Sequence, residues 1–350
     1  MQLETLISRI VPLDERAMQA ARERQDRLTK PQGSLGRLEN LSIQVAGITG
    51  QPIPHIQKKL VAVMAGDHGV AAAGVSAYPQ DVTAQMVLNF LRGGAAINVL
   101  SRHVGARVVV VDMGVAQDLD PHPGLVDKKI ARGTGNIARE PAMTRAQARE
   151  ALLAGASVVE AELDAGLDLL ATGDMGIGNT TPSAAIAAAL TGCPPALIAG
   201  RGTGLDDEGY QRKIQVIQQA LDGNRPDPQD GLDLLAKVGG FEIGGLAGAI
   251  LCAAANRRPV VIDGFISTAA AMIAAVLAPQ VRSYLIAAHC SQELGHRRML
   301  DWLGVEPLFD LQLRLGEGTG AVLAMSLVEA ACRLLAEMAT FGEASVSEKS

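Results

Sequence analysis

Apolar residues recur at helical spacing in two stretches within the first 50 residues. Side chains spaced in this way share one face of a helix. We therefore predict two helices, joined by a turn at Lys30–Ser34 in which Ser34 caps the second helix. The apolar positions are Leu3, Leu6, Ile7 and Ile10 in the first stretch and Leu35, Leu38, Leu41 and Val45 in the second.

A different pattern follows a Pro-rich link at Gln51–Pro54. Short, continuous apolar runs alternate with stretches of helical character, which is typical of parallel strands covered by helices on both faces. Right-handed crossovers make such a unit an open, doubly wound α/β domain. A closed barrel is disfavoured because the runs are irregularly spaced. The runs are Leu60–Ala65, Arg107–Met113, Leu167–Thr172, Ala196–Ala199, Pro259–Ile262 and Tyr284–Ala288.

The end of the chain returns to a helical pattern. Residues 321–338 are Ala-rich and amphipathic, and we expect this helix to pack against the N-terminal helices. The predicted organisation is a small helical domain of residues 1–50 with 321–345 and a Rossmann-like α/β catalytic domain of residues 51–320. Residues 346–350 are expected to form a frayed tail.

Composition narrows the class of protein. Apolar residues make up 48% of the chain and aromatic residues only 3%, so aliphatic side chains build the interior. The net charge of −6 and the lack of a basic stripe argue against a nucleic-acid partner. Four scattered cysteines suit a reducing compartment. No signal-peptide pattern is present, and the most apolar stretch, Phe265–Ala278, is too short to span a bilayer. We expect a cytoplasmic protein with no membrane partner.

Polar residues and glycines follow almost every predicted strand. In open α/β sheets, ligands bind outside the carboxyl ends of the strands, so these segments predict a catalytic crevice. A glycine-rich turn before the last helix is expected to join them. The segments are Gly66–Gly69, Asp112–Gly114, Gly173–Pro182, Gly200–Gly204, Asp263–Gly264, His289–Ser291 and Arg314–Gly320.

Two of these turns, Gly173–Thr181 and Gly316–Gly320, place glycines directly before a helix. Backbone N–H groups in such a turn approach an anion at the positive end of the helix, which favours phosphate binding. Neither turn is a Walker A loop, and neither is a dinucleotide fingerprint. The alternative is that the glycines only make tight connections between strand and helix.

Carboxylates in both glycine turns are candidates for acid–base chemistry. Glu317 lies between two glycines, although a carboxylate near a helix start is also stabilised by the helix dipole. Asp174 lies in the other turn. Lys213 follows the Gly200–Gly204 segment and is within reach of a phosphate, unless it is an ordinary surface lysine.

The histidines form no metal-binding motif. His68 follows Asp67 without a second pair at ligand spacing, and His289 and His296 are seven positions apart. Ser291 lacks the turn that presents a hydrolase nucleophile. We predict no metal and no cofactor.

Several motifs in order resemble one family, the nicotinate-nucleotide–dimethylbenzimidazole phosphoribosyltransferases. The resemblance covers about residues 5–340 and implies a doubly wound α/β fold with a small helical domain and a homodimer. It also implies the reaction of nicotinate mononucleotide with a free aromatic base, 5,6-dimethylbenzimidazole, to give α-ribazole 5′-phosphate and nicotinate. The motifs are Lys30–Glu39, Asp67–Val70, Gly173–Pro182, Lys237–Phe241, Asp263–Phe265 and Arg314–Gly320.

The resemblance also implies residue roles. Glu317 matches the family's general base, with Asp174 as a second carboxylate where many relatives have glutamate. Tyr78 and Met86 stand where well-known members have serine and glutamine, and with Met175 they make a more apolar base pocket. Other benzimidazoles, purines and phenolics are therefore open as acceptors. The expected phosphate- and nucleotide-binding residues are Gly176, Gly178, Asn179, Thr180, Gly202, Gly204, Lys213, Ser291, Gly316 and Gly318.

Two other function classes are weighed against a transferase. A nucleotide-dependent oxidoreductase is disfavoured by the missing dinucleotide fingerprint. A base or nucleotide carrier without catalysis is disfavoured by the intact turn around Glu317.

Overall fold

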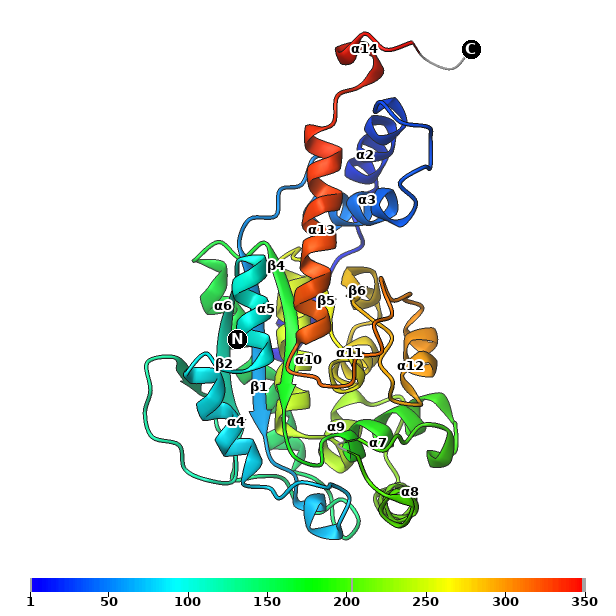
Figure 1. The fold of residues 1–350 in the computed structure, drawn as a ribbon. Coiled ribbons are helices and arrows are strands. Elements are labelled where there is room, and N and C mark those ends of the chain that lie inside the picture. The colour runs from blue at the N-terminus through cyan, green and yellow to red at the C-terminus, as the bar shows by residue number, and fades with distance from the viewer. Residues whose placement is uncertain (1, 203, 348–350) are drawn as a thin grey trace.

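The computed structural model describes residues 2–202 and 204–347. Within them, six strands form one parallel sheet in the order β3-β2-β1-β4-β5-β6, which confirms the doubly wound α/β fold (Figure 1). The strand order reverses between β1 and β4, and such a switch point opens a crevice at the carboxyl edge. The strands are β1 (Lys59–Gly66), β2 (Ala106–Gly114), β3 (Leu125–Asp127), β4 (Leu169–Met175), β5 (Val260–Ile262) and β6 (Leu285–Ala287).

Five of the six predicted apolar runs are strands. The run Ala196–Ala199 was wrong, because Pro195–Leu197 form a short 3-10 helix (η2). Pro194 and Pro195 have no N–H to donate to a sheet, and their fixed φ suits the start of a helical turn. Strand β3 was missed because it is a three-residue, partly exposed edge strand without a continuous apolar run.

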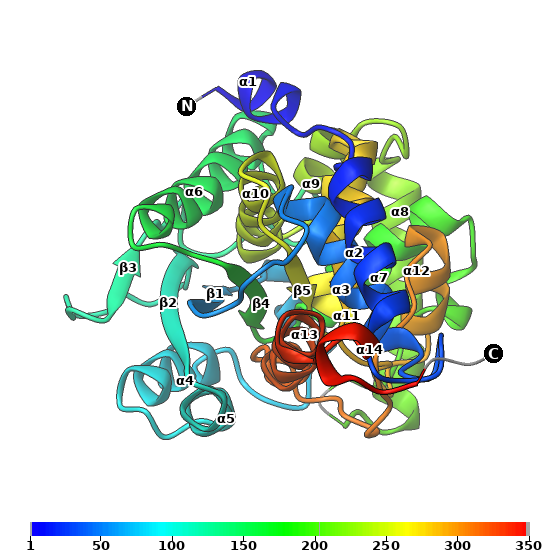
Figure 2. The ribbon, with the colours of Figure 1, turned by 90° about the horizontal axis from the view of Figure 1, so that it is seen from above.

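Helices cover both faces of the sheet, as the view from above shows (Figure 2). Alternate residues of β1 point to opposite layers, with Met64 in one hydrophobic cluster and Val63 in the other. The cluster around Met64 includes α1 (Leu3–Ser8), α6 (Arg145–Leu163), α7 (Thr180–Thr191), α8 (Asp207–Asn224), α9 (Gly231–Val238), α10 (Phe241–Ala255), α11 (Phe265–Leu277) and α12 (His296–Leu303). The cluster around Val63 includes α3 (Arg37–Thr49), α4 (Val82–Leu91), α5 (Ala96–Val104) and α13 (Thr319–Glu337).

Helices from both ends of the chain project together beyond the sheet (Figure 1). α2 (Glu15–Arg27) packs on α3 and on α13, and a small cluster joins Ala21, Ala46 and Leu335. α1, in contrast, packs on α6 and α10. The division into a helical and an α/β domain stays a prediction.

One prediction for the terminal helices is wrong, and another falls partly outside the described residues. Ser34 does not cap the second predicted helix, because α3 begins after Gly36, whose φ of 55° suits glycine. α14 (Phe341–Ala344) is followed by the segment 346–350 predicted to be frayed, of which 348–350 lie outside the described residues.

α13 is the one described helix that is long and apolar enough to cross a membrane. Of its apolar window, 56% is buried inside the protein, and a core helix meets the same length and composition criteria. Its N-terminal half packs in the cluster around Val63, with Val322, Met325 and Val328 buried.

Candidate active site

A cavity of about 480 Å³ lies at the carboxyl edge of the sheet. The loops after β4, β5 and β6 contribute to its wall, together with the turn before α13 and a segment that includes the start of α4. The lining residues are Tyr78, Val82, Met86, Asp174, Met175, Gly176, Ile177, Asn179, Thr180, Gly202, Gly264, Phe265, Ile266, His289, Ser291, Glu293, Arg314, Leu315, Gly316 and Glu317.

Glu317 occupies an unusual backbone conformation in this wall. Gly316, Glu317 and Gly318 have φ angles of 87°, 62° and 95°, and glutamate rarely adopts a positive φ. The turn lies directly on β4, because a Cβ on Gly173 would lie 2.3 Å from the carbonyl oxygen of Glu317. Such local strain persists where the surrounding structure enforces it, and it is concentrated at functional sites.

The buried carboxylate of Glu317 has one hydrogen-bond donor among the described residues. Its Oε2 accepts the backbone N–H of Ile97 at 3.1 Å, at the start of α5. Burial raises the pKa of Glu317, the hydrogen bond from Ile97 opposes this, and Asp263 adds repulsion that raises it further. A carboxylate with a raised pKa is a better general base near neutral pH.

Asp174 lies beside this turn at the end of β4. Its Oδ2 accepts a hydrogen bond from Nδ2 of Asn179 at 3.0 Å. Burial raises the pKa of Asp174 to about 8, and repulsion from Asp263 and Glu242 contributes. Asp174 is therefore mostly protonated at neutral pH. It lines the same cavity as Glu317.

A buried lysine lies behind the part of the cavity wall that Thr180 and Gly202 form. Lys213, on α8, is fully buried, and its Nζ donates to Oγ1 of Thr180 at 2.8 Å and to the carbonyl oxygen of Gly200 at 3.1 Å. Burial lowers the pKa of Lys213 to about 8, although Glu293 opposes the shift. A Cβ on Gly202 would lie 3.4 Å from this Nζ, so the glycine turn lies directly against the amine.

Comparison with known proteins identifies the family. A model described as "Phosphoribosyltransferase" matches residues 10–346. The chain belongs to this phosphoribosyltransferase family.

Curated relatives and solved structures agree with this assignment. A relative from Roseiflexus sp. (strain RS-1) is 65% identical over 347 residues, covering 99% of this chain and 98% of the relative. One from Geobacter sulfurreducens is 57% identical, covering 99% of this chain and 98% of the relative. Both are named nicotinate-nucleotide–dimethylbenzimidazole phosphoribosyltransferase. A crystal structure of a protein given the same name, from Thermus thermophilus, matches with a TM-score of 0.92 and 48% identity, covering 96% of this chain and 100% of the other.

Most residues predicted for the site line the cavity of this phosphoribosyltransferase, and four do not. Lys213 reaches toward it from behind Thr180. Gly178 faces Ala71, and Gly318 packs against Val61, while no described atom lies near a Cβ built on Gly204. The predicted residues that line the cavity are Tyr78, Met86, Asp174, Met175, Gly176, Asn179, Thr180, Gly202, Ser291, Gly316 and Glu317.

The sequence interpretation gave no role to several residues that the phosphoribosyltransferase places in or behind this cavity. Asp263 and His289 follow strands β5 and β6, so their position at strand ends was the available signal. Glu293 had no such signal, and its buried Oε2 has no hydrogen-bond partner among the described residues. Behind Gly176, Nε2 of His68 lies 2.7 Å from Oε1 of Glu242, and both side chains are buried.

Proposed function

We propose that this enzyme transfers the phosphoribosyl group of nicotinate mononucleotide to 5,6-dimethylbenzimidazole or a related aromatic base. The products are α-ribazole 5′-phosphate, formed with inversion, and nicotinate, and the step belongs to assembly of the cobalamin nucleotide loop. The names of the relatives support this reaction. The observation that carries it is the buried carboxylate of Glu317 in a strained turn, in one cavity with Thr180 and Gly202 beside Lys213.

The residues suit the chemistry of this transfer. Nicotinate leaves its positively charged ribosyl form as a neutral ring nitrogen, so the leaving group needs no acid. The attacking benzimidazole loses its N–H proton, and Glu317 is the base that accepts it. Lys213 and the turns at Thr180 and Gly202 hold the phosphate, as buried charge and backbone N–H groups do elsewhere. Much of the rate then comes from holding the two rings in line across the ribose C1′.

The acceptor base is assigned to the apolar part of the cavity. Met86, Met175 and Phe265 line it, and Tyr78 stands at its edge with 55% of its surface exposed. Methionine side chains adapt to flat rings of different shape. This wall suits 5,6-dimethylbenzimidazole and leaves other benzimidazoles, purines and phenolics as acceptors to compare.

A product assay tests the function directly. Purified enzyme is incubated with nicotinate mononucleotide and, separately, with 5,6-dimethylbenzimidazole, adenine and p-cresol, and the products are analysed by chromatography and mass spectrometry. We expect a base-dependent α-ribotide and release of nicotinate, fastest with a benzimidazole. If none of the bases yields a ribotide, the protein is a binder that does not catalyse the transfer.

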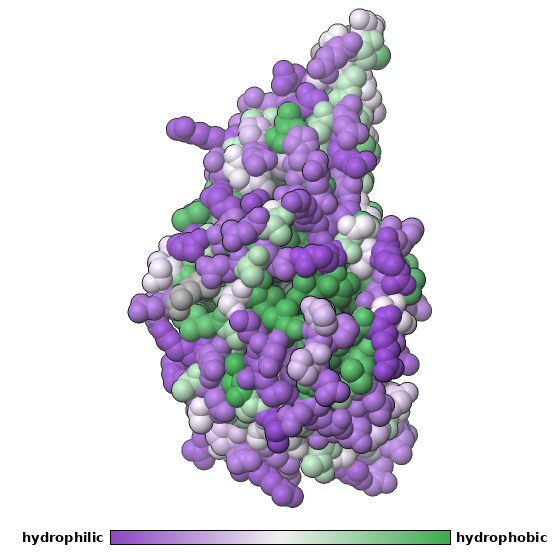
Figure 3. Space-filling view, turned by 90° about the vertical axis from the view of Figure 1, so that its left-hand side faces the viewer, coloured by the Kyte–Doolittle hydropathy of each residue, from purple (hydrophilic) through white to green (hydrophobic). Residues whose placement is uncertain are grey.

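We further propose a cytoplasmic homodimer that needs no metal or cofactor. Apolar residues gather in the middle of the face shown in Figure 3, and the large exposed apolar side chains of the described residues include Leu88 on α4 and Val99 on α5. Exposed apolar patches of this kind mark association surfaces. Sedimentation of the wild-type protein and of Val99→Arg tests the dimer.

A further inference from the structure

A buried histidine, His296, stands behind two walls of the cavity. It is the first residue of α12, and none of its surface is exposed. Its Nδ1 accepts the backbone N–H of Ser291 at 2.8 Å. Its Nε2 lies 2.8 Å from Oγ1 of Thr268, whose hydroxyl donates to the carbonyl oxygen of Gly264 at 2.7 Å.

The direction of each hydrogen bond in this chain is fixed. A backbone N–H can only donate, so Nδ1 of His296 carries no proton. In the neutral ring the proton is then on Nε2, which donates to Thr268, and the hydroxyl of Thr268 donates onward to Gly264. Burial lowers the pKa of His296 to about 3, and the neighbouring His289 adds to this, so the ring stays neutral in the working range.

The two ends of this chain belong to different walls of the same site. Ser291 and Glu293, on the loop after β6, line the cavity, and Gly264 lines it at the start of α11. Oγ of Ser291 also accepts the backbone N–H of Glu293 at 3.3 Å, so fixing Ser291 fixes the start of that wall.

We infer that His296 is a positioning residue that ties the Ser291–Glu293 wall to the Gly264 wall and so sets the geometry in which nicotinate mononucleotide binds. This inference rests on the proposed function. His296 itself does not line the cavity, so it acts through Ser291 and Gly264. Positioning residues of this kind matter because a small displacement of the wall that holds a ligand lowers the affinity for that ligand.

Kinetics of variants along the chain test the inference. His296→Ala removes both links, and we expect KM and Kd for nicotinate mononucleotide to rise about tenfold while kcat changes less than about threefold. His296→Asn restores only the acceptor for Ser291 and is expected to recover part of the affinity. Thr268→Val keeps the shape and cuts only the link to Gly264, so it should give an intermediate increase.

A matched control and a spectroscopic measurement separate positioning from folding. Ser267→Ala removes the neighbouring buried hydroxyl, which has no hydrogen-bond partner among the described residues, and should leave KM and Kd unchanged. Nitrogen NMR of the wild-type ring should show the neutral tautomer with the proton on Nε2. If His296→Ala and Thr268→Val lose thermal stability but keep the wild-type KM and Kd, or if the proton is on Nδ1, the inference is wrong. If His296→Ala does not fold, Thr268→Val decides.

The two proposals fail in different ways. Absence of ribotide from the wild-type enzyme overturns the proposed function alone. The Kd for nicotinate mononucleotide, measured by calorimetry without an acceptor base, still tests the role of His296.

Discussion

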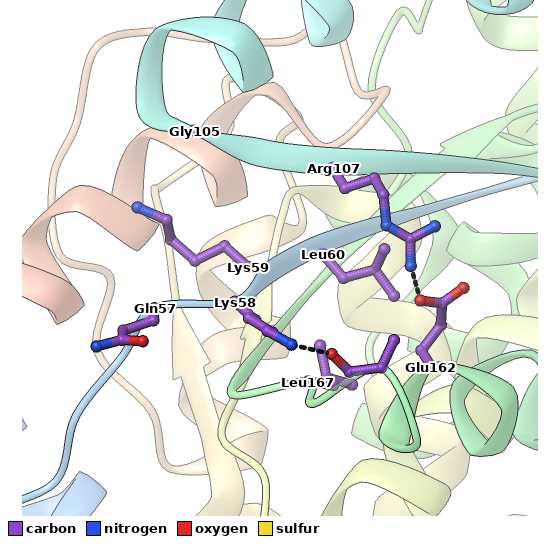
Figure 4. Close-up of a pocket in the computed structure, with 9 residues that line it drawn as sticks. Gln57, Lys58, Lys59, Leu60, Gly105, Arg107, Glu162 and Leu167 are labelled. Carbon is purple, nitrogen blue, oxygen red and sulfur yellow. Dashed lines mark hydrogen bonds and ion pairs between the residues drawn. The ribbon is translucent and has the colours of Figure 1, made fainter.

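The pocket at the amino edge of the sheet and the cavity at its carboxyl edge differ in how their charged side chains are paired. At the amino edge, the pocket beside the starts of β1 and β2 is lined by Lys58, Lys59, Arg107 and Glu162 (Figure 4). Arg107 is paired with Glu162, Lys59 with Glu329, and the amine of Lys58 donates to a backbone carbonyl. At the carboxyl edge, Asp174 and Glu317 line the cavity without a lysine or arginine partner among the described residues, and buried oxygens without a hydrogen-bond partner remain there on Asp263 and Glu293.

We infer from this difference that the carboxyl edge is the functional one. A paired charge near the surface contributes little to stability, and its partner already neutralises it, so it does not favour binding of a charged ligand. A buried charge without a partner destabilises the fold, and it is retained where chemistry needs a shifted pKa. Both edges have pockets, so the state of the charges, and not the hollow itself, indicates where the chemistry takes place.

The largest effect is expected from loss of the general base that we propose at the carboxyl edge. Glu317→Gln keeps the shape of the side chain but cannot accept a proton, so turnover should fall about 10²- to 10⁴-fold while nicotinate mononucleotide still binds. Steady-state kinetics and calorimetry measure the two effects. The matched control is Glu162→Gln at the amino edge, which should leave turnover unchanged. Near-wild-type turnover in Glu317→Gln would show that another group is the base.

The next effect concerns the phosphate site proposed around Lys213. Lys213→Met should weaken binding of nicotinate mononucleotide about 10- to 100-fold, because a charge-assisted hydrogen bond is lost. The pKa of Lys213 is lowered to about 8, so its charge is present below that pH and is lost above it. The wild-type Kd should therefore rise above pH 8, and this rise should be absent in Lys213→Met. Calorimetry across that pH range checks both, with Lys58→Met as the control at the amino edge.

A smaller effect, on stability, follows from Asp174. The pKa of Asp174 is raised to about 8 in the folded protein, compared with about 3.9 in the unfolded chain. Protonation of Asp174 therefore contributes stability that is fully present below about pH 3.9 and is lost as the pH rises to about 8. Asp174→Asn stays neutral and should gain stability relative to the wild type as pH rises from about 4 to about 8, with no further gain above that. Thermal unfolding at several pH values measures the difference. A constant difference across this range would contradict the raised pKa.

Most of the framework was predictable from the sequence, and the partners within the site were not. Continuous apolar runs and glycine-rich strand ends are local signals, so they predicted the sheet, the edge at which the cavity lies, and the turn that places Glu317 in its wall. His68 and Glu242 are 174 positions apart, and only the folded crossover brings them together. Glu293 was missed for the same reason, because its neighbour Gly200 comes from a distant loop. The edge strand β3 is too short to carry a pattern.

The smallest effect is expected at the amino edge, where the paired charges are predicted to have no role in the reaction. Arg107 is paired with Glu162, but 56% of the arginine side chain is exposed, so water competes for the pair and salt screens it. Arg107→Ala should therefore change the free energy of unfolding by less than about 1 kcal/mol, and KM and kcat should keep their wild-type values. Urea unfolding at low and high salt measures the first, and the product assay measures the second. A clear loss of turnover would mean that charge at the amino edge acts on the site across the sheet, and the contrast between the two edges would no longer hold.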